Sequence, residues 1–197
     1  MKLKKLALVI TLLLILMVIG LMIACAKNKE NPNTASSTAS DEAKQAQSMR
    51  IPGSIGSIAP DFSLITLNGE EVTLKQFKDK VVILNFWASW CGPCRYEIPD
   101  FIKMYDKHKK DGLEIIGIAL NSGNAAKIRS FVKNNSMNYT ILTGDEKYLK
   151  DLTVKYGGIR GIPTTFLIDK KGIIRQKWVG ARTEEIFMKE INKYIFN

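Results

Sequence analysis

Two cysteines separated by two residues, Cys91 and Cys94, are the residues of this chain best suited to covalent chemistry. They follow an apolar run, 81–84, that is typical of a buried strand, and they precede an amphipathic stretch, 96–110, that is typical of a helix. The first turn of a helix leaves backbone N–H groups unpaired and carries a partial positive charge. A thiolate is stabilised there, so we expect the pKa of Cys91 to lie below that of a free cysteine.

The two residues between the cysteines favour thiol–disulfide exchange. Pro93 suits the first helical position, because its missing N–H is not needed there, and Gly92 leaves Cys91 open as an exposed nucleophile. Cys94 lies one turn further into the helix and is expected to be more buried and less ionised. Cys91 would attack a disulfide of a partner protein, and Cys94 would then resolve the mixed disulfide. The redox-active disulfide between them would serve without any bound cofactor.

Other uses of the cysteine pair find less support in the sequence. A zinc site needs two further Cys or His ligands, and the chain offers only Cys25 and His108. Haem attachment needs a histidine directly after the second cysteine, where this chain has Arg95. A static disulfide around two residues is a poor staple, because so short a loop removes little chain entropy. We therefore expect no metal in this site.

The composition bounds the possible partners. The chain has 197 residues, 46% of them hydrophobic, and a formal charge of +10. This leaves room for one domain of about 140 residues after the N-terminal segments. Lysines spread along the expected helices explain most of the charge, and no basic stripe is interleaved with aromatic residues, so we expect no nucleic-acid binding. Some attraction to anionic lipid headgroups is consistent with the charge.

The N-terminal segment predicts a location at the cell membrane, facing its extracytoplasmic side. Residues 1–5 are basic, residues 6–24 carry no charge, and Cys25 follows. A lipoprotein signal has this form, with a small residue such as Ala24 before the cut and a lipidated cysteine after it, and we favour it. An uncleaved anchor is the alternative, because about 19 residues nearly cross a hydrocarbon core of ~30 Å. Both interpretations put the domain outside the cytoplasm, since the positive charges stay inside.

The rest of the chain divides into a tether and a folded domain. Residues 25–57 are expected to be a flexible tether, because the low-complexity stretch 31–40 cannot form a core. The domain is expected over 58–197. Its strands and helices alternate, which favours an α/β sandwich with a central mixed sheet. The expected strands are 59–64, 71–74, 81–87, 113–120, 139–143, 164–169 and 173–179, and the expected helices are 93–109, 125–133, 146–156 and 183–195.

Several motifs together resemble a known family. The segments 90–94 and 161–166 are similar to the two motifs of the thioredoxin superfamily. More narrowly, the opening 59–62, the strand–helix insert within 113–143 and the N-terminal membrane segment resemble the TlpA/ResA-type extracytoplasmic thiol–disulfide oxidoreductases. The resemblance implies a thioredoxin-like three-layer sandwich, with helices on both faces of a mixed sheet, an N-terminal β-hairpin and a strand–helix insert.

The resemblance also implies roles for particular residues. Pro163 matches a cis-proline that faces the dithiol, which leaves the backbone of Ile162 free to pair with a substrate strand beside Cys91. Glu97 matches an acidic residue near the cysteines, where it accepts the Cys94 proton or raises the thiol pKa values. The simpler alternative is that Glu97 only complements the positive helix end. The residues expected to contact substrate are Trp90, Gly92, Pro93, Ile162 and Pro163, with Trp87 and Trp90 as core or lid aromatics and Pro99 as a helix kink.

The family resemblance further implies the partners of the enzyme. The substrates would be disulfide-containing proteins, in the family often apocytochrome c, and the electrons would come from a membrane thiol-transferring protein. Better-known members have Glu where this chain has Gly92. The Gly-Pro pair between the cysteines, as in thioredoxin itself, favours a more reducing (more negative) reduction potential for the disulfide.

Two other functions share features with this sequence. Peroxiredoxins share the Ala-Pro-Asp-Phe opening, but they need Thr or Ser three residues before the reactive cysteine and Pro seven before it. Here those positions hold Ala88 and Leu84. Copper chaperones of this fold use cysteines three residues apart and a distant histidine. The spacing here is one residue shorter, and His108 is expected to lie on the protein surface, far along the helix from Cys94.

Overall fold

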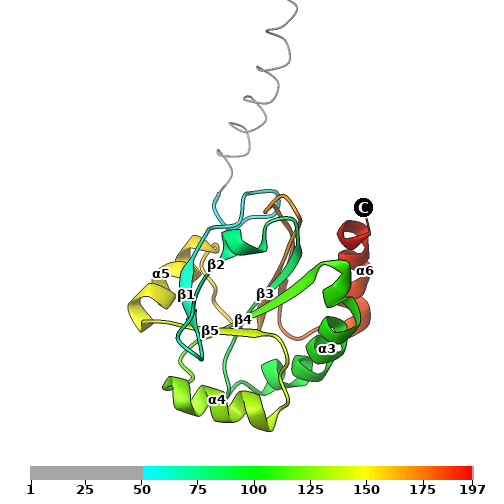
Figure 1. Cartoon of the computed structure of the whole chain (residues 1–197). Coiled ribbons are helices and arrows are strands. Elements are labelled where there is room, and N and C mark those ends of the chain that lie inside the picture. The colour runs from blue at the N-terminus through cyan, green and yellow to red at the C-terminus, as the bar shows by residue number, and fades with distance from the viewer. Residues whose placement is uncertain (1–50, 197) are drawn as a thin grey trace, which may run out of the picture. The chain divides into compact units, whose positions relative to one another are not determined.

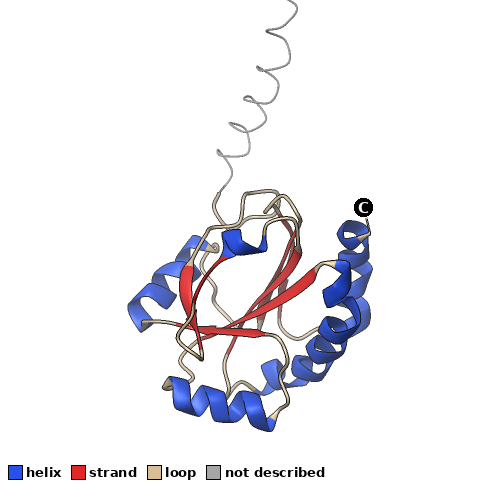
Figure 2. Ribbon diagram, in the orientation of Figure 1, coloured by secondary structure: helices blue, strands red, loops and turns tan. Residues whose placement is uncertain are grey.

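A computed structural model describes residues 51–196, which form one seven-stranded sheet with helices packed on it (Figures 1 and 2). The strands lie in the order β2-β1-β5-β4-β3-β6-β7. The strands are β1 (Ser63–Thr66), β2 (Glu71–Thr73), β3 (Val81–Trp87), β4 (Leu113–Ala119), β5 (Thr140–Thr143), β6 (Thr164–Ile168) and β7 (Ile174–Val179). The helices are α3 (Gly92–His108), α4 (Ala125–Asn134), α5 (Glu146–Lys155) and α6 (Glu184–Ile195), with single 3-10 turns η1 (Leu74–Phe77) and η2 (Lys109–Asp111).

The central strand β3 is buried on both of its faces. It pairs in parallel with β4 and antiparallel with β6, which confirms the expected mixed sheet. Alternate residues of β3 enter two separate cores, because successive side chains of a strand point to opposite faces. Val81 and Ile83 pack with residues of α3, α4 and α6, whereas Val82 and Leu84 pack with residues of α5. This is the three-layer arrangement that the family resemblance implied.

The first strand lies later in the chain than expected. The expected strand 59–64 is replaced by β1 at Ser63–Thr66, and the residues before it run beside the β6–β7 turn instead. The backbone N–H of Ala59 donates to the carbonyl of Gly172 at 2.8 Å. The expected hairpin turn is present, since Gly69 adopts a left-handed φ of 87° between β1 and β2.

Residues 51–57, expected as the end of the tether, pack against the domain. Gly53 is buried against the end of α5, where a Cβ would come within 2.3 Å of the backbone carbon of Tyr156. The Ser57 carbonyl accepts a hydrogen bond from the backbone N–H of Ile174 at 2.9 Å. The expected signal or anchor over 1–24 and the lipidation site Cys25 lie outside the described residues. Within 51–196, none of the helices has the length and apolar character needed to cross a membrane.

The connection from β3 to α3 positions the cysteines. β3 ends at Trp87, whose carbonyl accepts from the backbone N–H of Leu120 at 2.8 Å. α3 begins at Gly92, has Pro93 in its first turn, and continues as a single helix through Pro99. The chain therefore turns sharply from the carboxyl end of a buried strand into a long helix, and the cysteine pair occupies that turn.

Candidate active site

Cys91 and Cys94 form a disulfide at the start of α3. Their sulfur atoms are 2.11 Å apart. Cys91 is the N-cap residue of the helix, and its Sγ accepts a hydrogen bond from the backbone N–H of Cys94 at 3.2 Å. An N–H group directed at this sulfur favours its thiolate form once the disulfide is reduced, because the donor stabilises negative charge.

Cys91 was expected to be an exposed nucleophile, and the structure shows it buried. In this disulfide-bonded state Cys91 is only 5% exposed and Cys94 is 2% exposed. Cys91 is the more accessible of the two cysteines, but it is still a buried residue. A Cβ at Gly92 would meet no described atom within 4 Å, apart from its chain neighbours and the backbone of its own helix. The loop before β6 contacts Cys91 through the carbonyl oxygen of Ile162.

The proline loop faces the disulfide as expected. The peptide bond between Ile162 and Pro163 is cis, and the carbonyl oxygen of Ile162 lies 3.7 Å from Cys91 Sγ. The backbone N–H of Gly180, after β7, donates to the carbonyl of Pro163 at 2.8 Å and holds the loop in place. The fold thus brings residues 162 and 163 to Cys91, although they are far from it in the sequence.

The two tryptophans near the cysteines have different environments. Trp90 is 65% exposed, and its Nε1 donates to the carbonyl of Asn121 at 2.9 Å, so the ring is fixed at the surface beside Cys91. Trp87 is buried in the core, and its Nε1 has no hydrogen-bond partner among the described residues. Of the two, only Trp90 is placed to meet a partner protein.

Glu97 is a buried acid one helical turn after Cys94. Its side chain is nearly inaccessible, at 1% exposed. Oε1 accepts a hydrogen bond from the backbone N–H of Arg182 at 2.8 Å, and Oε2 lies 3.5 Å from Nδ2 of Asn85. Burial raises the pKa of Glu97 to about 7, and the Arg182 and Asn85 contacts oppose this only in part. Glu97 is therefore an enclosed group that titrates near neutral pH, and not a surface charge at the helix end.

Sequence reasoning did not single out the two residues that hold Glu97. Asn85 lies in the middle of β3, where its Nδ2 also donates to Oγ1 of Thr165 at 2.8 Å. A polar residue within the apolar run Val81–Trp87 was a signal that could have identified it, because buried polar groups need partners. Arg182 acts through its backbone in the loop between β7 and α6, and no sequence pattern marks such a contact.

His108 was expected on the surface, and the structure corrects this. It is 8% exposed, its Nδ1 is 3.0 Å from Oδ2 of Asp111, and its ring packs against Phe196. The reason is helical spacing: Phe101, Met104 and His108 share the buried face of α3. Its partners lie at the end of α3 away from the cysteines, which removes the histidine that the copper-chaperone hypothesis would need.

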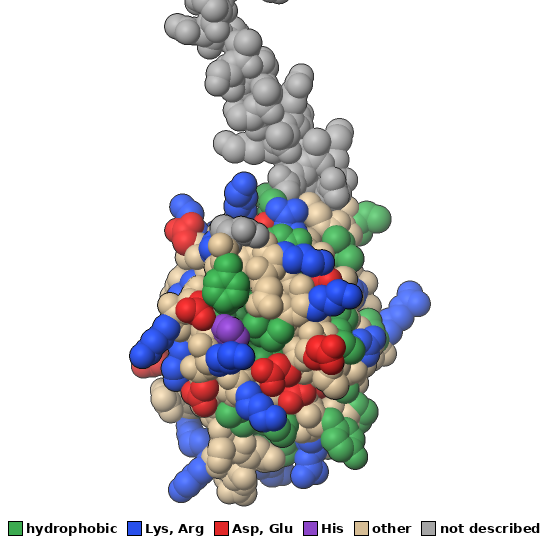
Figure 3. Space-filling model, turned by 90° about the vertical axis from the view of Figure 1, so that its right-hand side faces the viewer, with side chains coloured by type: hydrophobic (Ala, Val, Ile, Leu, Met, Phe, Trp, Pro, Cys, Tyr) green, Lys and Arg blue, Asp and Glu red, His purple; other side chains and the backbone are tan. Residues whose placement is uncertain are grey.

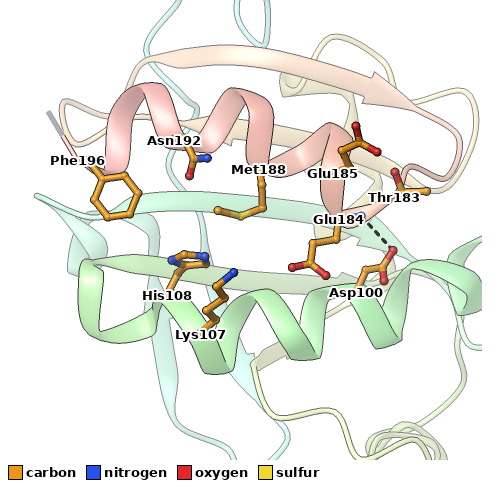
Figure 4. A pocket seen from close by; sticks show the side chains of 9 residues that line it. All are labelled: Asp100, Lys107, His108, Thr183, Glu184, Glu185, Met188, Asn192 and Phe196. Atoms are coloured by element: carbon orange, nitrogen blue, oxygen red, sulfur yellow. Dashed lines mark hydrogen bonds between the residues drawn. The ribbon is translucent and has the colours of Figure 1, made fainter.

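A polar groove of about 710 Å³ lies between α3 and α6 (Figure 4). Asp100 and His108 line it from α3, and Glu184, Met188 and Phe196 line it from the α6 side. Figure 3 shows this face, on which basic and acidic side chains alternate around small hydrophobic areas. The dashed contact in Figure 4 is the hydrogen bond from the backbone N–H of Glu184 to Oδ2 of Asp100, at 3.0 Å. This bond joins the start of α6 to α3.

The residues before Cys91 do not form a peroxidase site. Ala88, three residues before Cys91, is fully buried and has no hydroxyl group to donate to a peroxide. Leu84, seven residues before, is packed in the core of β3. The reactive group of the site is therefore the cysteine pair itself, whose chemistry is disulfide exchange.

Comparison with known proteins agrees with this chemistry. A family model described as the AhpC/TSA family matches residues 55–177. The thiol-disulfide oxidoreductase ResA of Bacillus thuringiensis is 37% identical over 131 residues, which are 66% of this chain and 73% of ResA. The thioredoxin-like protein YneN of Bacillus subtilis is 36% identical over 132 residues, 66% of this chain and 74% of YneN. A solved structure, a thioredoxin-family thiol:disulfide interchange protein from Chlorobium tepidum, is 32% identical with a TM-score of 0.63, and the match covers 70% of this chain and 94% of that one.

Proposed function

Because this chain belongs to the AhpC/TSA family and, within it, to the thioredoxin-like thiol–disulfide oxidoreductases of the ResA type, we propose that it is a membrane-tethered extracytoplasmic enzyme that reduces disulfides in partner proteins. The observation that carries the proposal is the disulfide at the start of α3. The Cys91 sulfur accepts a hydrogen bond from the backbone N–H of Cys94 and lies 3.7 Å from the carbonyl oxygen of Ile162.

The reaction begins from the reduced pair. The Cys91 thiolate attacks one sulfur of a partner disulfide, which forms a mixed disulfide and releases the other partner sulfur as a thiolate. Cys94 then loses its proton, and its thiolate attacks Cys91 Sγ. This closes the Cys91–Cys94 disulfide and releases the second partner sulfur. Two electrons pass to the partner in this cycle, and a membrane thiol-transferring protein returns them to the enzyme.

Glu97 is the proton acceptor for Cys94 in this proposal. It lies on the same face of α3 as Cys94, three residues further on, and its pKa of about 7 lets it take a proton at neutral pH. Its enclosed position keeps water from competing for that proton. The Arg182 N–H fixes one oxygen of the carboxylate, so the group is held in place while its charge changes.

The partner chain would bind across the loop that precedes β6. The backbone of Ile162, half-buried beside Cys91, offers groups for pairing with an extended strand, and the cis Pro163 donates no N–H of its own. Trp90, Gly92 and Pro93 are exposed around the disulfide and form the rest of the contact surface. Such backbone pairing accepts many sequences, and reduced apocytochrome c is the product that we propose for the cell.

Trapping the mixed disulfide tests the proposal. We expect the Cys94→Ser variant to accumulate mixed disulfides with its substrates, because attack by Cys91 survives and resolution does not. The Cys91→Ser variant should be inactive in insulin reduction and should trap nothing, which makes it the matched control. Identification of the trapped proteins by mass spectrometry would name the substrates. Retained turnover in the Cys91→Ser variant would contradict the mechanism.

The tether has its own test. We propose that Cys25 carries lipid after cleavage behind Ala24, and the mass of the N-terminal peptide from the membrane fraction measures this directly. A diacylated cysteine at the new N-terminus is the expected result. A peptide that begins at Met1 would show the uncleaved anchor instead.

A further inference from the structure

An apolar groove lies at the end of the sheet opposite the dithiol. It has a volume of about 540 Å³ and is lined by Val82, near the start of β3, and by Ile168, at the end of β6. The cysteines follow the other end of β3, about 23 Å away along a seven-residue strand. Figure 1 shows the β6–β7 turn and residues 51–58 together at one end of the domain, with the start of α3 at the other. The apolar residues of the groove are Ile58, Ala59, Leu74, Phe77, Val82 and Ile168.

Three isoleucines of the segment 51–58 are exposed, and one of them, Ile58, lines the groove. Ile51, Ile55 and Ile58 are 76%, 54% and 58% exposed. Their segment is not loose, since the backbone N–H of Gly56 donates to the carbonyl of Ile174 at 2.7 Å. Keeping three large aliphatic side chains in water on an ordered segment is unfavourable, and such patches mark interaction surfaces.

The rim of the groove is basic. Lys75, Lys78, Lys170 and Lys171 surround it. The carboxylates nearby are compensated, because Asp61 pairs with Lys75 at 3.0 Å and Asp169 pairs with Arg175 at 2.6 Å. Neither Lys78 nor Lys171 forms an ion pair with any described residue, and both are exposed. Positive charge thus remains around an apolar centre.

We propose that this surface, formed by the three isoleucines, the groove and its lysines, docks on an anionic lipid bilayer. The isoleucines enter the interface, and the lysine side chains extend along the apolar surface to place their ammonium groups at the lipid phosphates. The inference rests on the proposed tethering: residue 51 lies in this surface, and the chain before it includes the uncharged segment 6–24. Docking would turn the Cys91 end of the sheet away from the membrane, toward partner proteins.

Footprinting of the full-length protein in vesicles tests the docking. The chain is reconstituted in phosphatidylcholine vesicles with or without phosphatidylglycerol, and hydroxyl radicals oxidise exposed side chains. We expect oxidation of Ile51, Ile55 and Ile58 to fall severalfold only on the anionic vesicles. Val179 and Tyr96, which are exposed at the dithiol end, serve as internal references and should not change.

A pair of charge variants tests the role of the lysines. Lys78→Gln with Lys171→Gln should weaken docking by about fivefold for each lysine removed. Lys133→Gln with Lys189→Gln is the matched control, because both lysines are exposed on α4 and α6, which pack on the face of the sheet opposite the groove, and it should dock as the wild type does. Both double variants should keep full activity in insulin reduction.

The outcomes separate this inference from the proposed function. Flotation of the chain with both vesicle types but equal oxidation of the isoleucines would overturn the docking alone. Failure to float with either type would overturn the tether and, with it, the docking. Protection that depends on protein concentration without vesicles would show that a second copy covers the surface, and would also overturn the proposal.

Discussion

At the scale of single residues, the site combines a disulfide with an enclosed acid. The Cys94 N–H stabilises charge on Cys91, and burial raises the pKa of Glu97 to about 7. Glu97 accepts hydrogen bonds from the Arg182 backbone and from Asn85, and no ion pair to its carboxylate is present among residues 51–196. Its charge therefore depends on pH in the range where the enzyme works, and two measurements can detect this.

The first prediction concerns stability. Glu97 holds its proton more tightly in the folded state, with a pKa of about 7, than at the ordinary value of 4.5. The folded state therefore binds more protons between these values, so its stability falls as pH rises from about 4.5 to 7. Glu97→Gln should remove up to about 3 kcal/mol of this dependence. Urea unfolding of the oxidised protein at pH 5 and pH 8 measures the effect; parallel pH curves for wild type and variant would contradict it.

The second prediction concerns the reduced enzyme. Above pH 7 a charged Glu97 disfavours a thiolate on the same helix face, because like charges repel. Glu97→Gln should therefore shift the pH dependence of thiol alkylation to lower pH. The shift should be larger for the cysteine that is alkylated more slowly. Iodoacetamide labelling of each cysteine, followed by mass spectrometry, gives the curves. Identical curves would leave Glu97 without a role in proton transfer.

The third prediction uses the open space at Gly92. A Cβ there would meet no atom within 4 Å, so Gly92→Glu should change the free energy of unfolding by about 0.5 kcal/mol or less. The new carboxylate should raise the pKa of Cys91 and slow its alkylation near neutral pH. Gly92→Gln is the uncharged control for the same side-chain size. Equal alkylation rates for the two variants would show that charge at position 92 does not reach the sulfur.

At the scale of elements, the site depends on how α3 meets its neighbours. Oδ2 of Asp100, on α3, accepts a hydrogen bond from the backbone N–H of Glu184 at 3.0 Å, so a residue of one helix caps the start of another, α6. Thr183 occupies the N-cap position of α6, but its side chain makes no capping bond. The same loop carries Arg182, which holds Glu97, so the start of α6 and the buried acid are positioned together.

The cap predicts a contrast between two variants. Asp100→Ala should cost about 1 kcal/mol of stability, as the loss of an N-cap does, although residue 100 is far from α6 in sequence. Thr183→Ala should cost much less, because no side-chain bond is lost. Asp100→Asn keeps an acceptor oxygen and should retain most of the stability. Thermal unfolding measures all three, and equal losses for Asp100→Ala and Thr183→Ala would refute the cap.

At the scale of the whole molecule, one sheet joins two cores. The β3 strand contributes to both, with Ile83 in one and Leu84 in the other. Both cores are built from residues between Ala59 and Ile195, and the dithiol belongs to the core that α3 covers. Because both cores are built on the same central strands, loss of one core removes support from the strands on which the other core packs.

This arrangement predicts cooperative unfolding. Trp87 and Trp178 report on one core by fluorescence, whereas far-UV circular dichroism reports on all elements. We expect the two transitions of the oxidised protein to coincide in urea, as they do for two-state domains. A variant in the other core, such as Leu152→Ala, should move both transitions together. Separate midpoints would show that the two layers unfold independently.

The sequence by itself determined the features that depend on short segments. Cys91 and Cys94 lie within one helical turn of each other, so their spacing and the following helix were sufficient to predict the pair and its chemistry. Continuous apolar runs placed β3, β4 and β6, and amphipathic stretches placed the helices, each within a residue or two. These features follow from backbone periodicity and local steric preference, which neighbouring residues set.

Only the tertiary structure decided the features that depend on distant contacts. The sequence matched Pro163 to a family motif. The carbonyl oxygen of Ile162, the residue before it, lies near Cys91 Sγ because β6 pairs with β3. The neutral-range pKa of Glu97 comes from burial and from the Arg182 backbone, 85 residues away. The helical spacing of His108 with Phe101 and Met104 is a local signal of burial, but its contact with Phe196 at the chain end is decided by tertiary packing. Burial and electrostatics are sums over neighbours in space, so they become fixed only when the chain has folded.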